Sequence, residues 1–168
     1  MGNLQPTCQG ASASPYRPRS ICGRFNRRHF RPGEHFTLLT PHTPETIRAP
    51  FANYAHGIEV PAGYRLLVCS GQLGATPDDQ VPADVEAQAE ICFSNIVEIL
   101  KSAALCADDI VRLNAFVTDR ADLAGYMRAR DRFVGARAPA STLMIVSGFS
   151  RPEFKVEIEA LAAGKARS

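Results

Sequence analysis

The clearest periodic pattern in the sequence lies between residues 84 and 103, where apolar side chains recur at steps of three or four. The apolar positions are Val85, Ala89, Cys92, Ile96, Ile99 and Ala103. The polar side chains elsewhere around the same turns are Glu86, Gln88, Glu90 and Glu98. This spacing predicts a helix that begins near Asp84 and packs one face against a sheet.

Two apolar stretches precede this helix, on either side of the turn-forming residues 61–63. Residues 51–60 and 64–71 are predicted to be strands joined by a tight connection. In the second strand Val68 points to one face and Cys69 to the other. Because both faces carry apolar side chains, we predict a sheet that is covered on both sides.

The rest of the chain continues with strands and one more helix. Further strands are predicted within residues 109–119, 141–148 and 154–162, and a second helix from about Ala121 to Val134. The predicted order β-β-α-β-α-β-β has a hairpin at each end, which indicates an α+β fold with a mixed sheet and two helices on one face. The other face must also be buried, and association with further copies of the chain would bury it.

The composition is that of one ordinary globular domain, because 45% of the 168 residues are apolar and 21% are charged. The net charge of +2 is unevenly distributed. Residues 1–36 contain four prolines and six arginines against one glutamate, so this segment carries +5 and the rest of the chain −3. Since the segment has neither helical nor strand periodicity, we predict that it is a flexible basic arm.

Three roles for this arm fit its composition. The first is a dispensable extension or a mis-assigned start. The second is an organelle transit peptide, and the third is a tail that binds phosphate backbones. Its prolines argue against the amphipathic helix that a transit peptide needs. The chain has no secretory signal and no stretch near the roughly 18 apolar residues that span a membrane. We therefore expect a cytoplasmic protein, with organelle import only if the arm is a transit peptide.

The usual cofactor and metal motifs are missing from the sequence. The five cysteines form no CxxC pair, so reduced thiols are expected rather than a zinc site or a disulfide framework. The chain has no Walker loop, dinucleotide fingerprint or nucleophile elbow, and its four histidines lack metal-site spacing. We expect a protein without a metal or an organic cofactor.

Several short motifs of the domain occur together and in a fixed order. They are NYAHG at 53–57, SGQ at 70–72, the FVTD to FVG segment at 116–135, PAST at 139–142 and VEIEA at 156–160. With these motifs, residues 47–163 resemble the reactive intermediate deaminase family, the Rid or YjgF-like proteins. The resemblance implies a chorismate-mutase-like fold and a homotrimer with a central barrel and a cleft between neighbouring subunits.

The resemblance also implies an activity. The best-known members hydrolyse unstable enamines and imines such as 2-aminoacrylate, and they release ammonia without a metal or organic cofactor. Water attacks the C=N carbon, so the site must hold the substrate carboxylate, place the water and stabilise the tetrahedral intermediate. By resemblance the cleft contains Tyr54, Ser70, Gly71 and Glu157, and Glu157 orients or deprotonates the attacking water.

Three positions of the implied cleft differ from the family pattern. The carboxylate-binding arginine is expected where this chain has Ser141, a pocket asparagine where it has Met127, and a cysteine where it has Leu143. The cleft should therefore be less polar, and the substrate larger or less anionic at the usual place than 2-aminoacrylate. Arg130 follows Met127 by three residues on the same helical face, which makes it a candidate replacement for the missing cation.

Each candidate residue also has a purely structural interpretation. Glu157 is also consistent with an exposed strand glutamate or a member of an ion pair. Tyr54 is also consistent with a core residue, and Ser70 with a residue that caps a glycine turn. Arg130 fits a solvated helical face that pairs with neighbouring aspartates. Two other functions also stay open, a non-catalytic trimer that binds a metabolite or protein, and RNA cleavage. RNA cleavage is weakened because only the arm is basic.

Overall fold

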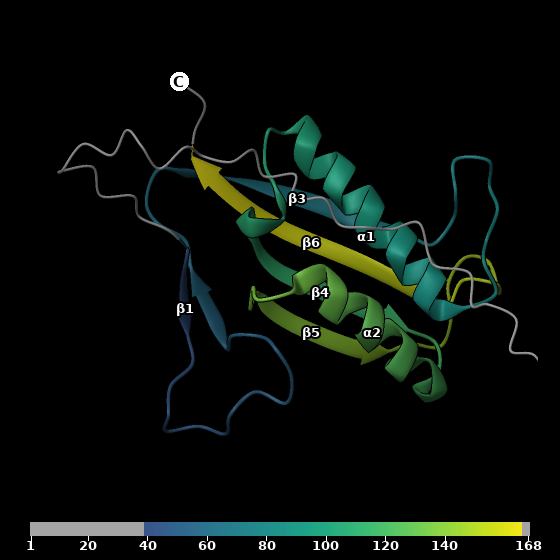
Figure 1. The fold of residues 1–168 in the computed structure, drawn as a ribbon, viewed down its shortest axis with the longest axis horizontal. Helices are drawn as coiled ribbons and strands as arrows, with labels where there is room; N and C mark the ends of the chain where they lie inside the picture. Colours follow the sequence, from purple (N-terminus) through teal and green to yellow (C-terminus); the bar gives the residue numbers. More distant parts are fainter. Residues whose placement is uncertain (1–38, 166–168) are drawn as a thin grey trace, which may run out of the picture.

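The computed structural model describes residues 39–165 and is built on a four-stranded mixed sheet with two helices on one face (Figure 1). The strands are adjacent in the order β3-β6-β4-β5. Their bounds are Tyr64–Leu73 for β3, Ile110–Val117 for β4, Ala140–Ile145 for β5 and Val156–Lys165 for β6. The helices are α1, Val85–Ser102, and α2, Leu123–Val134. The predicted α+β class with a mixed sheet is confirmed, and the arm predicted at residues 1–36 lies outside the described residues.

Helix α1 forms where the apolar periodicity predicts it. The Asp84 carboxylate accepts a hydrogen bond from the Ala87 N–H at 3.0 Å and so caps the first turn. The fully buried side chains that α1 packs on the sheet include Ala89, Cys92, Ile96 and Leu100. Gln88 departs from the expected pattern, because this polar side chain is fully buried as well. No helix within residues 39–165 is long and apolar enough to cross a membrane.

Strand β6 lies inside the sheet, antiparallel to both β3 and β4. Strands β4 and β5 are parallel neighbours, and α2 is the crossover between them. The hairpin predicted from residues 141–148 and 154–162 is therefore wrong. The reason is that β6 is buried or half-buried from Val156 to Gly164, so it fits a position with a strand on each side better than an edge.

The hairpin predicted before α1 is also wrong. Within residues 51–60 the only strand is β2, Gly57–Glu59, and it pairs with β1, Thr40–His42, in a separate two-stranded antiparallel sheet. A turn at Gly63, with a φ of +82°, then leads into β3 without pairing β2 to it. The observed order has one strand more than predicted, since β1 was not expected.

The loop before β2 is held against the connection between α2 and β5. The Asn53 side-chain amide donates hydrogen bonds to the carbonyls of Gly135 and Arg137, both at 2.8 Å. Ala55 forms an isolated parallel bridge with Ala140 at the start of β5. These contacts fix residues 51–55 beside the helix face of the sheet.

The face of the sheet opposite the helices is open in a single chain. Leu66 and Val68 point to this face and are 60% and 76% exposed. Polar side chains cross the same face, where Arg112 donates to Asn114 at 2.8 Å and Asn114 donates to Glu159 at 3.1 Å. The open face therefore combines an apolar patch with an ordered polar network.

Candidate functional site

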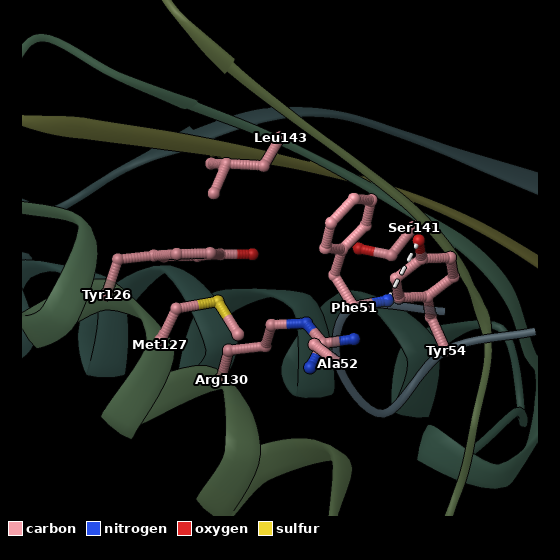
Figure 2. Close-up of a pocket in the computed structure, with 8 residues that line it drawn as sticks. All are labelled: Phe51, Ala52, Tyr54, Tyr126, Met127, Arg130, Ser141 and Leu143. Carbon is pink, nitrogen blue, oxygen red and sulfur yellow. Dashed lines mark hydrogen bonds between the residues drawn. The ribbon is translucent and has the colours of Figure 1, made fainter. Parts of the chain in front are cut away.

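A pocket lies between α2, β5 and the loop before β2 (Figure 2). Its volume is about 380 Å³, which is within the range of small-molecule sites. The eight residues that line it are Phe51, Ala52, Tyr54, Tyr126, Met127, Arg130, Ser141 and Leu143. Four of the seven residues that the sequence assigned to the candidate site are among them, namely Tyr54, Met127, Arg130 and Ser141.

The local structure explains why these side chains meet. Met127 and Arg130 lie three residues apart on α2 and share a face, which Tyr126 borders. Ser141 points to the helix side of the sheet, since its register partner on β4, Leu113, is fully buried. The lining is mostly apolar, and Arg130 is its one charged residue.

Tyr54 lines the pocket from the loop and also holds the loop in shape. It is half-buried and does not belong to the core, and its hydroxyl accepts a hydrogen bond from the Phe51 N–H at 3.4 Å. The His56 ring stands edge-on to the Tyr54 ring at 5.9 Å, and its Nε2 lies 2.9 Å from the Arg48 carbonyl. His56 thus supports the loop without lining the pocket.

Arg130 is buried, with 2% of its side chain exposed. Its guanidinium donates to Asp131 Oδ1 at 2.9 Å and to the Asn53 carbonyl at 2.7 Å. Because a buried charge is costly unless it is paired, these two partners are what keep it inside. The pairing of Arg130 with a neighbouring aspartate is confirmed, but its interpretation as part of a solvated face is wrong. Arg128 and Arg132 do form such a face, and they pair with glutamates of α1 instead of aspartates.

Tyr126 was missed by reasoning from the sequence. Its side chain is 1% exposed, and its hydroxyl has no hydrogen-bond partner within the part of the chain that the structure describes. Burial raises the pKa of Tyr126, so the hydroxyl stays protonated at neutral pH. Its position beside Met127 and one turn before Arg130 is the signal that could have identified it.

The other three predicted residues, Ser70, Gly71 and Glu157, lie apart from this pocket. Glu157 sits on β6 between Val156 and Ile158, which are fully buried on the helix side, so its side chain points to the open face. A Cβ atom at Gly71 would lie only 1.7 Å from Glu157 Oε1, so the carboxylate lies directly over this glycine. Within one chain the two groups of candidate residues are on opposite faces of the sheet.

Ser70 and Gly71 lie inside β3 and not in a turn. The register between β3 and β6 shifts between Cys69 and Gln72, and the strand continues to Leu73. The interpretation of Ser70 as a turn cap is therefore wrong. Such an irregularity changes the direction of nearby side chains, and here it brings the backbone at Gly71 under the β6 carboxylate.

The buried thiols are unsuited to nucleophilic chemistry. Burial raises the pKa of Cys92 to about 12 and also raises the pKa of Cys69. Both therefore stay protonated near neutral pH, whereas a reactive cysteine needs a thiolate. Within residues 39–165, no group of three His, Cys, Asp or Glu side chains is arranged to hold a metal ion.

Comparisons with known proteins agree on one family. A family model described as Endoribonuclease L-PSP matches residues 45–164. The 2-iminobutanoate/2-iminopropanoate deaminase of Escherichia coli is 32% identical over 130 residues, which are 75% of this chain and 95% of that protein. This chain belongs to the reactive intermediate deaminase family, the Rid or YjgF-like proteins.

Solved structures of relatives have a similar fold. A Rid family protein of unknown function from Yersinia pestis matches with a TM-score of 0.64 and 27% identity, over 74% of this chain and 97% of that one. Escherichia coli TdcF with bound serine matches with a TM-score of 0.57 and 29% identity, over 69% of this chain and 91% of that one. The mixed sheet with two helices is therefore the fold of this family.

Proposed function

We propose that this protein is a deaminase that hydrolyses small reactive imines and enamines at a cleft between subunits. The main support is that four residues predicted for one cleft line a single pocket, while the Glu157 carboxylate is held over Gly71. The name of the Escherichia coli 2-iminobutanoate/2-iminopropanoate deaminase supports the reaction class. The serine bound to TdcF supports a ligand that resembles an amino acid.

A second copy of the chain would complete the site. The pocket is built on β5 and α2, whereas Ser70, Gly71 and Glu157 lie on β3 and β6, and β3 and β5 are opposite edges of the sheet. Association through the open face would bury Leu66 and Val68 and bring the second group to a neighbour's pocket. Light scattering should give a mass near three times 18.2 kDa, and a monomer would contradict this arrangement.

The proposed reaction needs one water molecule and no other co-reactant. Glu157 takes a proton from the water molecule while the water oxygen bonds to the carbon of the C=N group. The π electrons of the C=N bond move to the nitrogen. Glu157 then delivers the proton to this nitrogen. In the second step the C–N bond breaks, the nitrogen takes the hydroxyl proton, and ammonia and a 2-keto compound are released.

Ammonia release from freshly generated imines tests the proposal. An amino acid oxidase supplies the imines, and the panel includes bulky and uncharged side chains. Release faster than in buffer alone is expected for at least one class of imine. No acceleration with any imine would contradict the proposal, and saturable ligand binding without turnover would then support a metabolite-binding trimer.

Gly71→Ala is expected to lower ammonia release by about 10- to 100-fold with the fold intact. The methyl group would displace the Glu157 carboxylate, and a catalytic group misplaced by about 1 Å costs on the order of 100-fold. Because a flexible side chain can move away, the thermal midpoint should shift by less than about 4 °C. Gly57→Ala is the matched control, since a Cβ there meets only His42 Cβ at 3.9 Å. Equal activity of both variants would contradict the role of Glu157.

A further inference from the structure

The hydroxyl of Tyr126 is the polar group of the pocket that the fold itself does not explain. It is buried and has no hydrogen-bond partner among the described residues, which costs free energy that a fold normally avoids. Figure 2 shows this hydroxyl pointing toward the middle of the pocket, with the Ser141 hydroxyl directed inward from the opposite wall. A group that is costly in the empty protein and aimed into a cavity is placed to bind a ligand.

We propose that Tyr126 and Arg130 form the carboxylate-binding subsite of this pocket, and that the pocket selects 2-imino acids with an apolar side chain. This inference rests on the proposed function and adds to it the residues that hold the substrate. By resemblance a cation was expected at Ser141 on β5. The structure instead provides one from the facing wall, on α2.

Arg130 has hydrogen-bonding capacity to spare. Its guanidinium carries five N–H donors, and its bonds to Asp131 and to the Asn53 carbonyl use two of them. The Asp131 side chain is 57% exposed, so water screens its charge and leaves much of the attraction of the guanidinium for an anion in the pocket. The planar guanidinium and the Tyr126 hydroxyl together offer donors to both oxygens of a carboxylate.

The charge of the pocket favours a carboxylate over a phosphate. Arg130 is the one charged residue among the eight that line it, and a single positive charge matches a monoanion. A phosphate dianion in the same apolar surroundings would keep one negative charge without a partner, which is costly. The subsite is therefore assigned to a carboxylate.

The remaining lining fits an apolar substituent. Phe51, Met127 and Leu143 present apolar side chains to the pocket, and no acidic residue lines it. A volume of about 380 Å³ exceeds what a two- or three-carbon imino acid would fill. Substrates with longer aliphatic or aromatic side chains would displace water from these apolar surfaces and bind more tightly.

Binding of a carboxylate and its matched amide to the full-length protein tests the subsite without turnover. The probes are 3-phenylpropanoate and 3-phenylpropanamide, which have nearly the same shape and differ in charge. By isothermal titration calorimetry the carboxylate is expected to bind at least about tenfold more tightly than the amide. Equal affinities, or no binding of either probe, would overturn the proposal.

Tyr126→Phe is the sharpest variant, because it removes only the unpaired hydroxyl. The affinity for 3-phenylpropanoate is expected to fall about tenfold, while the affinity for the amide changes by less than about twofold. The thermal midpoint of the free protein should stay the same or rise, since the cost of a buried unpaired group disappears. A hydroxyl with a merely structural role would not give this combination, and unchanged carboxylate affinity would overturn the role of Tyr126.

Arg130→Gln is expected to remove the preference for the carboxylate over the amide. Arg132→Gln is the matched control, because Arg132 lies on the same helix but pairs at the surface with Glu86 and Glu90. The control should keep the tenfold preference, and a preference retained in Arg130→Gln would overturn the proposal. If Arg130→Gln does not fold, as judged by circular dichroism, Tyr126→Phe and the amide comparison still decide the question.

The outcomes separate this subsite from the proposed function. Ammonia release by a protein that binds the amide as tightly as the carboxylate would overturn the subsite and leave the deaminase proposal standing. Binding of 3-phenylpropanoate through Tyr126 and Arg130 without ammonia release from any imine would leave the subsite standing and overturn the deaminase proposal.

Discussion

Gln88→Leu is expected to destabilise the protein by about 3 to 5 kcal/mol, although leucine is similar in size and apolar. The Gln88 amide is fully buried and donates to the carbonyls of Pro82 at 2.7 Å and Glu153 at 2.9 Å. Its oxygen accepts a hydrogen bond from the Lys155 N–H at 2.9 Å. Leucine would leave these three backbone groups without that partner, and a buried group left unpaired costs about 1 to 3 kcal/mol. New apolar contacts would offset a smaller part of this cost.

Urea unfolding at a fixed protein concentration measures this change, since association would make the apparent stability depend on concentration. Gln80→Leu is the matched control, because the Gln80 side chain is exposed and donates to the Asp78 carbonyl at 3.3 Å on the surface. The control should change the free energy of unfolding by less than about 0.5 kcal/mol. A loss below about 1 kcal/mol for Gln88→Leu would mean that water replaces the lost hydrogen bonds.

Gln88 also connects the fold to the candidate site. Its amide joins Pro82, in the loop before α1, to the segment that leads into β6, and Glu157 follows Lys155 by two residues. A Cβ atom at Gly74, just after β3, would lie 2.4 Å from Gln88 Cβ, so helix and strand approach closely at this point. The position of the strand that carries Glu157 therefore depends on a polar residue of the helix core.

The same residue shows the limit of periodicity as a predictor. The apolar spacing located α1 and its cap at Asp84, because a helix that packs on a sheet needs apolar side chains on one face. It placed Gln88 among the polar positions elsewhere on the helix, and that interpretation failed. A buried amide is stable only when distant backbone groups satisfy it, and here two of the partners lie near residue 154, far along the chain.

Strand positions were more predictable than strand partners. Short apolar stretches located β3, β4 and β5 to within a few residues, and alternation of apolar and polar side chains located β6, because both patterns are local properties. The choice of neighbours depends on which strand is best buried in the whole sheet. The apolar character of β6 placed it between β3 and β4, and the hairpin predicted with β5 was lost as a result. The hairpin predicted before α1 was lost for a different reason, because β2 pairs with β1.

The candidate site was predicted in part. Helical spacing led from Met127 to Arg130, and both line the pocket with Tyr54 and Ser141, although their roles in binding stay predictions. Tyr126 was missed because an aromatic residue on a helix is usually a core residue, and only the structure shows its unpaired hydroxyl. The strand register was also needed to see that the sheet lies between this group of residues and Glu157.

Glu157→Gln is expected to lower the rate of ammonia release by roughly 100- to 10,000-fold, the usual contribution of a general base. Glutamine keeps the shape of the side chain over Gly71 but cannot take a proton from the attacking water. Initial rates at saturating imine measure the change as kcat, and light scattering confirms that the assembly is unaltered. Glu157→Gln with more than about a tenth of the wild-type rate would show that another group activates the water.

Glu159→Gln is the control that separates proton transfer from the general effect of negative charge on this face. Glu159 lies two residues further along β6 on the same side of the sheet, and it accepts a hydrogen bond from Asn114 at 3.1 Å. This variant should keep its rate within about threefold, whereas equal losses in both variants would indicate an effect of charge on the assembly.

Glu157→Gln should also bind 3-phenylpropanoate as tightly as the wild type, because Tyr126 and Arg130 are proposed to hold the carboxylate. Binding kept and turnover lost would place substrate recognition and water activation on opposite faces of the sheet, joined only when two copies of the chain meet.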